Sequence, residues 1–164
     1  MEGRRQDWLV REQFRVAQVA SLPYAHNPSN CTHFKEFFDK SAEWDGEEGR
    51  RFFESLSAEQ LASCYYHQLA DWRVVADASV TLYRAFENRS VSELQDAIET
   101  WSLPSNERSH LFWIFADPIV WGGEAATIVN GQHRVCAIRA SGAVLCVIDH
   151  NRFDPYGSDS SRQS

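Results

Sequence analysis

The 164-residue sequence has no long uninterrupted run of apolar residues. A membrane-spanning helix needs about 20 apolar residues in succession, so we expect neither a membrane segment nor a membrane partner. The first 14 residues also lack the apolar centre of a signal peptide. These two absences predict a cytoplasmic protein.

Basic residues are scarce and scattered. The chain has 16 Lys and Arg against 23 Asp and Glu, and its net charge is −7. Proteins that bind duplexes without sequence preference neutralise phosphates with clustered Lys and Arg, and the sequence has no such cluster. We therefore do not expect nucleic acid as a partner. A nuclease is disfavoured as well, because the sequence contains no clustered acidic metal site.

The four cysteines do not follow the pattern of a disulfide framework, and without an export signal we expect reduced thiols. Cys31 lies two residues before His33. Cys64 lies three residues before His67, so the two pairs together offer the ligand types that a structural zinc ion prefers. The first spacing is tighter than in most zinc sites, however, and Cys64 lies within a helical pattern. We therefore predict small buried thiols and no metal site.

Aromatic residues are plentiful, with 6 Trp, 10 Phe and 5 Tyr in a chain that is 43% apolar. Disordered segments are poor in aromatic residues, and a chain of this length buries roughly two-thirds of the surface that its unfolded form exposes. We predict one folded domain over residues 1–150 that needs no metal ion or disulfide for its core. Residues 151–164, rich in Ser and Asp, are predicted to form a flexible tail.

The first half of the chain is predicted to contain one strand followed by helices. Residues 14–19 alternate loosely, as strands do, and the prolines within residues 21–28 predict an extended loop. Residues 32–40 have the apolar spacing of a short helix, and residues 44–49 predict a charged turn. Residues from about 50 to 115 are predicted to form a largely helical insertion.

Two capping boxes mark helix starts within this insertion. In each, a Ser side chain accepts a hydrogen bond from an amide three residues later, and the Gln or Glu there returns one. The first box, at Ser57, opens a long helix, with an extension to residue 86 left open. The second, at Ser90, opens a helix that runs through Trp101 and that Pro104 closes.

The last third of the chain changes character, because short apolar runs alternate with turn residues. Residues 109–115 fit a helix or a strand. The expected order is then strand, hairpin turn, strand, helix and strand, at residues 117–121, 122–124, 126–129, 135–140 and 144–148. Gly142 follows the expected helix, and glycine commonly ends helices. The predicted fold class is α+β, with a small mixed β-sheet.

Residues 130–134, here termed the NGQHR loop, join the second of these strands to the helix. Amides at a helix N-terminus lack intrahelical partners and lie at the positive end of the helix dipole. Gly131 permits a sharp turn and a close approach of a ligand to the backbone. Arg134 offers a forked donor that matches a phosphate, and His133 can donate to an oxyanion or move a proton near neutral pH. The pattern predicts an anion site, and a helix cap without a ligand is the alternative.

Residues 127–142 resemble the signature of the ParB/sulfiredoxin-like superfamily. In that signature a hydrophobic strand leads into Asp-Gly-His/Gln-His-Arg and then into an Ala-rich helix that ends in Gly. Residues 16–28 are similar to the first strand and Asn-Pro loop of such domains. These two segments comprise 29 of the 164 residues, and the helical insertion has no counterpart in the resemblance. The resemblance implies a ParB/sulfiredoxin-like core.

Members of this superfamily bind nucleotides, so the resemblance implies ATP or another nucleoside triphosphate, with Mg²⁺, as the cofactor. It implies phosphate contacts from Gly131, Gln132, His133 and Arg134. Asn130 would lie near a metal ion or the ribose. Sulfiredoxins have a nucleophilic Cys where this chain has Gln132, so reductase chemistry is not expected, and Cys136 is expected to point elsewhere. Partition proteins have a long DNA-binding segment after the loop, for which this chain is expected to leave no room.

The branch of the superfamily that phosphorylates free serine keeps the His-Arg pair and needs a carboxylate base near the substrate hydroxyl. Asn130 in place of the usual Asp removes one negative ligand for Mg²⁺. Glu36 and Glu124 are the candidates for the base, and His26 is a candidate to line the same pocket. For Glu36 and Glu124, a solvated surface position is the alternative.

The sequence and the resemblance together predict an ATP-dependent phosphotransferase or NTPase that acts on a small hydroxyl compound. In such chemistry the protein mainly positions groups and neutralises charge. His133 would stabilise the transferring group, and Glu36 would orient the acceptor. The alternative is a non-catalytic ParB-like regulatory or nucleic-acid-associated interaction module, with the acidic, aromatic insertion as its partner surface. A protein partner or a homodimer is left open.

Overall fold

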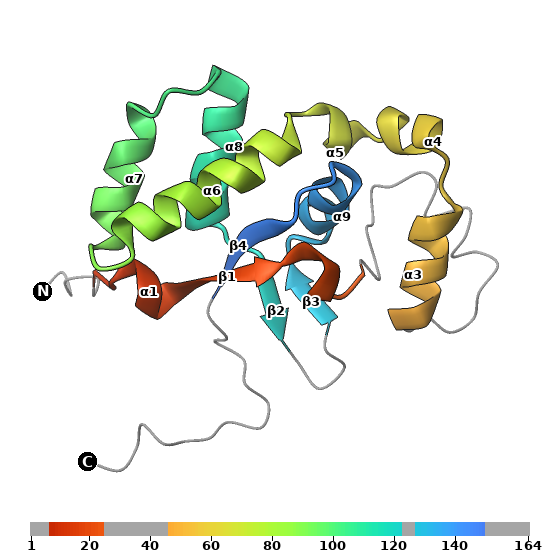
Figure 1. Ribbon diagram of the computed structural model, residues 1–164, viewed down its shortest axis with the longest axis horizontal. Helices are drawn as coiled ribbons and strands as arrows, with labels where there is room; N and C mark the ends of the chain where they lie inside the picture. Colours follow the sequence, from red (N-terminus) through yellow and green to blue (C-terminus); the bar gives the residue numbers. More distant parts are fainter. Residues whose placement is uncertain (1–6, 25–45, 123–126, 150–164) are drawn as a thin grey trace, which may run out of the picture.

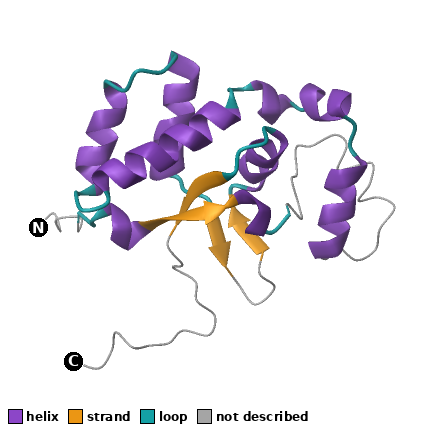
Figure 2. Ribbon diagram, viewed as in Figure 1, coloured by secondary structure: helices purple, strands orange, loops and turns teal. Residues whose placement is uncertain are grey.

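The computed structural model describes residues 7–24, 46–122 and 127–149 (Figure 1). Helices and strands mix along the chain and helices predominate (Figure 2), which confirms the α+β class. The helices are α1 (Val10–Gln13), α3 (Gly46–Ser55), α4 (Ala58–Ser63), α5 (Tyr65–Gln68), α6 (Trp72–Phe86), α7 (Val91–Glu99), α8 (Ser105–Ala116) and α9 (Gln132–Ala140), with a 3₁₀ turn η1 (Val19–Ser21). The strands are β1 (Phe14–Gln18), β2 (Val120–Gly122), β3 (Thr127–Asn130) and β4 (Leu145–Asp149).

The strands form two antiparallel pairs in the described part of the chain. β1 pairs with β4, with Phe14 opposite Asp149. β2 pairs with β3, with a shift of register after Val120. The backbone N–H of Asp149 donates to the Ile119 carbonyl at 2.8 Å, so the end of β4 is joined to the start of β2. Within the described residues, the expected mixed sheet is therefore two linked antiparallel pairs.

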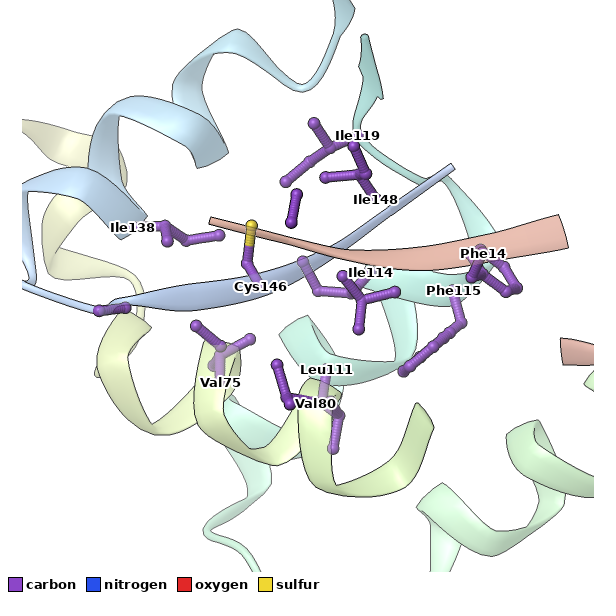
Figure 3. Packing of buried hydrophobic residues seen from close by; sticks show 14 of the residues in the cluster. Phe14, Val75, Val80, Leu111, Ile114, Phe115, Ile119, Ile138, Cys146 and Ile148 are labelled. Atoms are coloured by element: carbon purple, nitrogen blue, oxygen red, sulfur yellow. The ribbon is translucent and has the colours of Figure 1, made fainter. Parts of the chain in front are cut away.

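The hydrophobic core lies where α6 and α8 pack against each other and against the β1–β4 pair (Figure 3). The rings of Phe14 and Phe115 meet edge to face, with centroids 5.1 Å apart. The inner face of α6 buries residues at helical spacing, namely Trp72, Val75, Ala76, Ser79, Val80 and Leu82. Ile138 of α9 and Ile148 of β4 reach the same core. The core therefore fixes α9, the helix that follows the NGQHR loop.

Both predicted capping boxes are confirmed. The Gln60 N–H donates to Ser57 Oγ at 3.1 Å, and the Ser57 N–H donates to the Gln60 side chain at 2.9 Å. Ser90 and Glu93 form the equivalent pair, at 3.2 and 3.0 Å. Each box depends on four adjacent residues alone, which is why the sequence reveals it.

The single long helix predicted from Ser57 onward is wrong, because the chain divides there into α4, α5 and α6. Cys64, expected inside a helix, has an extended backbone (φ −65°, ψ 127°) and separates α4 from α5. A second break precedes α6, where the Val74 N–H donates to the Asp71 side chain at 3.2 Å. The Asp71 N–H in turn donates to Glu107 Oε1 at 3.0 Å. This partner lies 36 residues further along the chain, so the sequence does not reveal it, although Asp is a preferred N-cap residue.

Three other boundaries differ from the prediction. α3 begins at Gly46, within the segment predicted as a charged turn. α7 ends at Glu99 rather than at Trp101. Pro104, expected to close that helix, instead precedes α8, where proline is tolerated because a first-turn N–H has no intrahelical partner. Residues 109–115, left open by the sequence, are helical and lie within α8.

Charge spacing explains why α3 replaces the predicted turn. Arg50 pairs with Glu47 one turn earlier and with Glu54 one turn later. Opposite charges three or four residues apart stabilise a helix modestly. Glu47, one of the charges of the predicted turn, therefore supports a helix through Arg50.

Several predicted elements lie outside the described residues. These are the helix over residues 32–40, the tip of the hairpin turn at residues 123–124, and the tail over residues 151–164. The single-domain prediction stays a prediction. None of the helices in the described ranges is long and apolar enough to cross a membrane.

Candidate functional site

The NGQHR loop turns the chain from β3 into α9, which starts at Gln132 rather than at the expected residue 135. Gly131 has a φ of 87°, in the left-handed region that side chains disfavour. A Cβ at this position would lie 2.9 Å from Ile119 Cγ1 and 3.1 Å from Arg134 Nη2. Glycine thus lets the loop backbone lie directly against the start of β2 and against the guanidinium of Arg134.

All five residues of the NGQHR loop line a cavity of about 370 Å³, here termed the loop cavity. Its other walls come from α5, α6 and α8 and from the residues that follow α5 and α8, namely Tyr66, Leu69, Trp72, His110, Trp113 and Asp117. No pattern in the sequence connects these aromatic residues with the loop. The half-exposed Trp113 departs most from a core residue, but the sequence carries no signal of its exposure.

Arg134 is held in the wall of the loop cavity, with 13% of its side chain exposed. Nη1 donates to the Trp113 carbonyl at 3.2 Å, and Nη2 lies 3.7 Å from Oδ2 of Asp117. Burial lowers the pKa of Arg134 and the Asp117 charge opposes this effect, yet a guanidinium keeps its charge in proteins. The protein itself therefore already binds Nη1, one of the two guanidinium nitrogens expected to hold a phosphate. The other nitrogen, Nη2, faces the carboxylate of Asp117, whose side chain is 61% exposed.

Asn130 fastens the loop to the segment that follows α8. Its Nδ2 donates to Oδ1 of Asp117 at 2.9 Å and to the Pro118 carbonyl at 2.8 Å. These two bonds use the donors of the amide and leave only its oxygen for a ligand. The Asn130 side chain therefore joins the loop to residues 117 and 118, in addition to the position near a metal ion or the ribose that the resemblance implies.

His133 belongs to an aromatic wall. Its ring stacks on Tyr66, with centroids 3.9 Å apart and planes 10° apart. Trp72 Nε1 donates to the Tyr66 carbonyl at 2.7 Å, which links α5 to α6. Burial lowers the pKa of His133, and among smaller effects Cys64 raises it and His67 lowers it. The imidazole is therefore neutral at pH 7.

His110 is the second imidazole of the loop cavity, and its ring centroid lies 5.0 Å from that of Trp72. Burial lowers the pKa of His110, while Glu107 raises it and Arg134 lowers it. Among the described residues that line the loop cavity, the charged groups at pH 7 are then Arg134 and Asp117. Such a cavity suits a ligand with a planar, uncharged part and an anionic part.

The structure brings together only part of the predicted site. Gln132 lines the loop cavity with its four neighbours in the loop. Glu36, His26 and Glu124 lie outside the described residues, as do Cys31 and His33. Cys136 does not line the loop cavity.

A second cavity, of about 510 Å³, is lined by residues of α4, α5, α6 and α9 and their connections. It includes His67 and Arg73 and no residue of the NGQHR loop. It is larger than the loop cavity, and its lining combines two basic side chains, His67 and Arg73, with the carboxylate of Asp71. It serves below as a reference site.

No group of three or more His, Cys, Asp or Glu among the described residues is arranged to hold a metal ion. Asp117 is the carboxylate that lines the loop cavity. Mg²⁺ usually takes one or two carboxylates together with phosphate oxygens. The loop cavity therefore fits Mg²⁺ only as the companion of a phosphate ligand.

No protein-family model, curated protein or solved structure matches this chain. The resemblance to the ParB/sulfiredoxin-like superfamily therefore rests on residues 16–28 and 127–142 alone, and it stays a prediction.

Proposed function

We propose that this chain binds a nucleotide in the loop cavity, with a phosphate at the NGQHR loop and the base among the aromatic side chains. One observation carries the proposal: the N-terminus of α9, the guanidinium of Arg134 and an aromatic wall line the same cavity of about 370 Å³. Cavities of this size commonly take small-molecule ligands. In this proposal the last third of the chain and β1 form a ParB/sulfiredoxin-like core.

The phosphate end of the site is built from the loop backbone and Arg134. Gly131 has no side chain that could cap α9, which leaves the first-turn N–H groups of His133 and Arg134 for an anion. The Trp113 carbonyl already orders the guanidinium, so a ligand loses little entropy in ordering it. A phosphate would displace the exposed Asp117 carboxylate from Nη2.

The base end of the site is planar and uncharged. Tyr66, Trp72 and Trp113 line it, and the neutral imidazole of His133 already stacks on Tyr66. Stacking of a base on an aromatic side chain is worth about 1–3 kcal/mol. Any nucleobase can stack on these aromatic rings through its flat face. The aromatic wall therefore supports nucleotide binding but does not indicate which base is bound.

We propose further that the ligand is ATP or another nucleoside triphosphate with Mg²⁺, and that its terminal phosphate passes to a small hydroxyl compound or to water. The resemblance supports this step by analogy. Bound Mg²⁺ would neutralise charge on the phosphates. Of the described residues, Arg134 is placed to do the same, and the neutral His133 can accept a proton. Glu36 stays the proposed carboxylate that orients the acceptor.

Nucleotide binding without turnover is the second candidate function. Asp117 is already tied to Arg134 and Asn130, and His133 is engaged with Tyr66. Because these side chains already have partners within the protein, they are less available for catalysis. This favours a ParB-like module that binds a ligand and contacts a partner protein through the acidic helical segment.

A thermal-shift panel of ATP, ADP, CTP and GTP with Mg²⁺ tests the binding proposal. The variants are Arg134→Gln and, as a matched control, Arg73→Gln, an exposed residue of the second cavity. A ligand at 100 times its Kd adds about 2.7 kcal/mol to the free energy of unfolding. We expect one nucleotide to stabilise the wild type and Arg73→Gln but not Arg134→Gln, each compared with its own unliganded midpoint. No shift with any nucleotide, or an equal shift in Arg134→Gln, would refute the proposal.

Turnover separates the two candidate functions. Phosphate release, measured with the nucleotide that binds, should occur in the wild type and fall in His133→Ala if the chain is an enzyme. Binding with no release above background, alone and with small hydroxyl compounds, would support the non-catalytic module.

A further inference from the structure

The second cavity is separate from the proposed nucleotide site and has no role in it. Tyr66 of α5 lines the loop cavity, whereas the next residue, His67, lines the second cavity, and Trp72 is common to both. In Figure 1, α5 lies beside α9, between α4 and α6, and these four helices form the second cavity. Its volume of about 510 Å³ is that of a small-molecule site.

Most of the wall of the second cavity is apolar. Leu61 and Trp72 line it together with five alanines. The alanines are Ala58, Ala62, Ala70, Ala137 and Ala140. Ser141 also lines it, but its hydroxyl donates to the Ile138 carbonyl at 2.6 Å and accepts from the Ala143 N–H at 3.3 Å. This part of the cavity suits the apolar body of a ligand.

His67 brings to this wall a polar atom that lacks a partner. Its Nε2 atom is buried and has no hydrogen-bond partner among the described residues. Buried polar atoms in folded proteins are almost always hydrogen-bonded, and one that is not destabilises the fold. Because a neutral imidazole can carry its proton on this nitrogen, an oxygen atom of a ligand can accept a hydrogen bond from it.

Arg73 supplies a positive charge that the described part of the chain does not use. It is exposed in the first turn of α6, and its guanidinium makes no hydrogen bond or ion pair with another described residue. Arg134 differs, because it is tied to the Trp113 carbonyl and faces Asp117. A guanidinium pairs with a carboxylate through two parallel hydrogen bonds. Arg73 is therefore available for an anionic ligand.

Asp71 is the acidic residue of the lining, and its carboxylate already has a structural role. Its Oδ1 atom accepts a hydrogen bond from the Val74 N–H at 3.2 Å and so caps α6. The positive end of the helix dipole offsets part of its charge. With the carboxylate engaged in this cap, the second cavity offers Arg73 as a cation and His67 as a hydrogen-bond donor, a combination that suits an anion.

We propose that the second cavity is a binding site for a small monocarboxylic acid with an apolar body. The carboxylate pairs with the guanidinium of Arg73 and accepts a hydrogen bond from Nε2 of His67. The carbon chain lies among the alanines, Leu61 and Trp72. Within α4 and α5, every residue of which is described, no side chain is buried. Segments with few buried apolar contacts open at low free energy, so this wall can move to admit the ligand.

Alanine methyl groups provide a direct probe of this site. Five alanines line the second cavity and none lines the loop cavity, so NMR of the full chain with labelled alanine methyls distinguishes the two. The protein is titrated without nucleotide, first with acetate, then with hexanoate and octanoate. We expect the methyl signals of the lining alanines to shift and the Kd to fall roughly threefold for each added methylene. Hexanol, which has no charge, should bind about tenfold more weakly than hexanoate.

Four variants separate the proposed contacts. Arg73→Gln should raise the Kd for hexanoate about tenfold, and His67→Asn, which lacks an equivalent of Nε2, should raise it as well. Asp71→Asn keeps an equally good cap but removes a negative charge, so it should lower the Kd about twofold to threefold. Arg84→Gln is the matched control, because Arg84 is also exposed on α6 but does not line the second cavity. It should leave the Kd unchanged. Circular dichroism first confirms that each variant is folded.

Three results would overturn the proposal. The first is the absence of any shift of the lining alanines with the three acids. The second is an equal Kd for hexanoate in the wild type and in a folded Arg73→Gln. The third is tighter binding of 2-aminohexanoate than of hexanoate, together with weaker binding in Asp71→Asn, because Asp71 would then hold an ammonium group. None of these measurements uses a nucleotide, so their failure leaves the proposed function untouched.

Discussion

The NGQHR loop lies between two regions that are built in opposite ways. The core under it, formed by α6, α8, β1 and β4, contains most of the fully buried residues. The wall formed by α4 and α5 contains no buried residue, and every residue in it is described. Of these two helices, α5 lines the loop cavity through Tyr66, whereas α4 lines only the second cavity. α9 belongs to both regions, because Ile138 enters the core while His133 stacks on Tyr66 of the wall. The comparison indicates that one side of the site is fixed by the core, whereas the side formed by α5 is loosely held. Binding sites often include a segment of low local stability.

The largest expected effect is a difference in unfolding free energy between a variant in the core and a variant in the wall. Phe115→Ala removes a fully buried ring that packs on Phe14 and should cost about 3–5 kcal/mol of unfolding free energy. Tyr65→Ala removes a side chain in the wall that is 68% exposed and should change it by less than about 0.5 kcal/mol. Urea unfolding measures both. Similar losses in the two variants would mean that the wall is part of the core.

The loop itself comes next, with a matched pair of glycines. Gly131 and Gly142 both have positive φ, but a Cβ at Gly131 would lie 2.9 Å from Ile119, whereas a Cβ at Gly142 would meet nothing within 4 Å. Gly142→Ala should therefore cost only the left-handed conformation, about 1–2 kcal/mol. Gly131→Ala should cost at least about 1 kcal/mol more, because Ile119 or Arg134 must also move. Equal costs by urea unfolding would argue against the close packing of the loop.

The two capping boxes sharpen the comparison further. Loss of an N-cap side chain costs about 1 kcal/mol. Ser90→Ala should lower global stability by this amount, because α7 buries Leu94 and Ile98. Ser57→Ala should leave global stability nearly unchanged and speed amide hydrogen exchange in α4, whose side chains are not buried. A global loss in Ser57→Ala equal to that in Ser90→Ala would contradict the loose wall.

The smallest effect is in the pH dependence of stability. Burial lowers the pKa of His133 and of His110 below the reference value of 6.5, so the unfolded chain binds their protons more readily. The stability that the neutral rings contribute is then present above pH 6.5 and is lost as the pH falls below that value. Between about pH 7.5 and pH 5.5, the wild type should lose more stability than the double variant His110→Asn, His133→Asn. Identical losses would show that neither ring is desolvated.

The sequence predicted the features that depend on neighbouring residues. Ser57 and Ser90 could be assigned because each box is complete within four residues. Gly131 could be assigned as the turn into α9 because a strand, a glycine and a helical pattern follow each other there. The break at Cys64 was not predicted, because the apolar spacing of a helix continues across it from Leu61 to Tyr65 and Leu69.

The walls of the loop cavity were also beyond the sequence. Tyr66 and Trp113 are separated from the loop by long stretches of chain, and aromatic residues of this kind are usually core. The pairing of Arg134 with Asp117 and of Asn130 with Pro118 joins the loop to the end of α8. Nothing in the local pattern indicates which segment will face the loop.

The central claim is that a phosphate binds at the N-terminus of α9. The most direct test follows the backbone amide signals of isotope-labelled protein by NMR during titration with ATP and Mg²⁺, with inorganic phosphate and adenosine as partial ligands. The account predicts that ATP and phosphate shift the amides of residues 131–134 most, and that adenosine shifts the ring signals of Tyr66 and Trp113. Shifts confined to the second cavity, or no shift at the NGQHR loop, would contradict it.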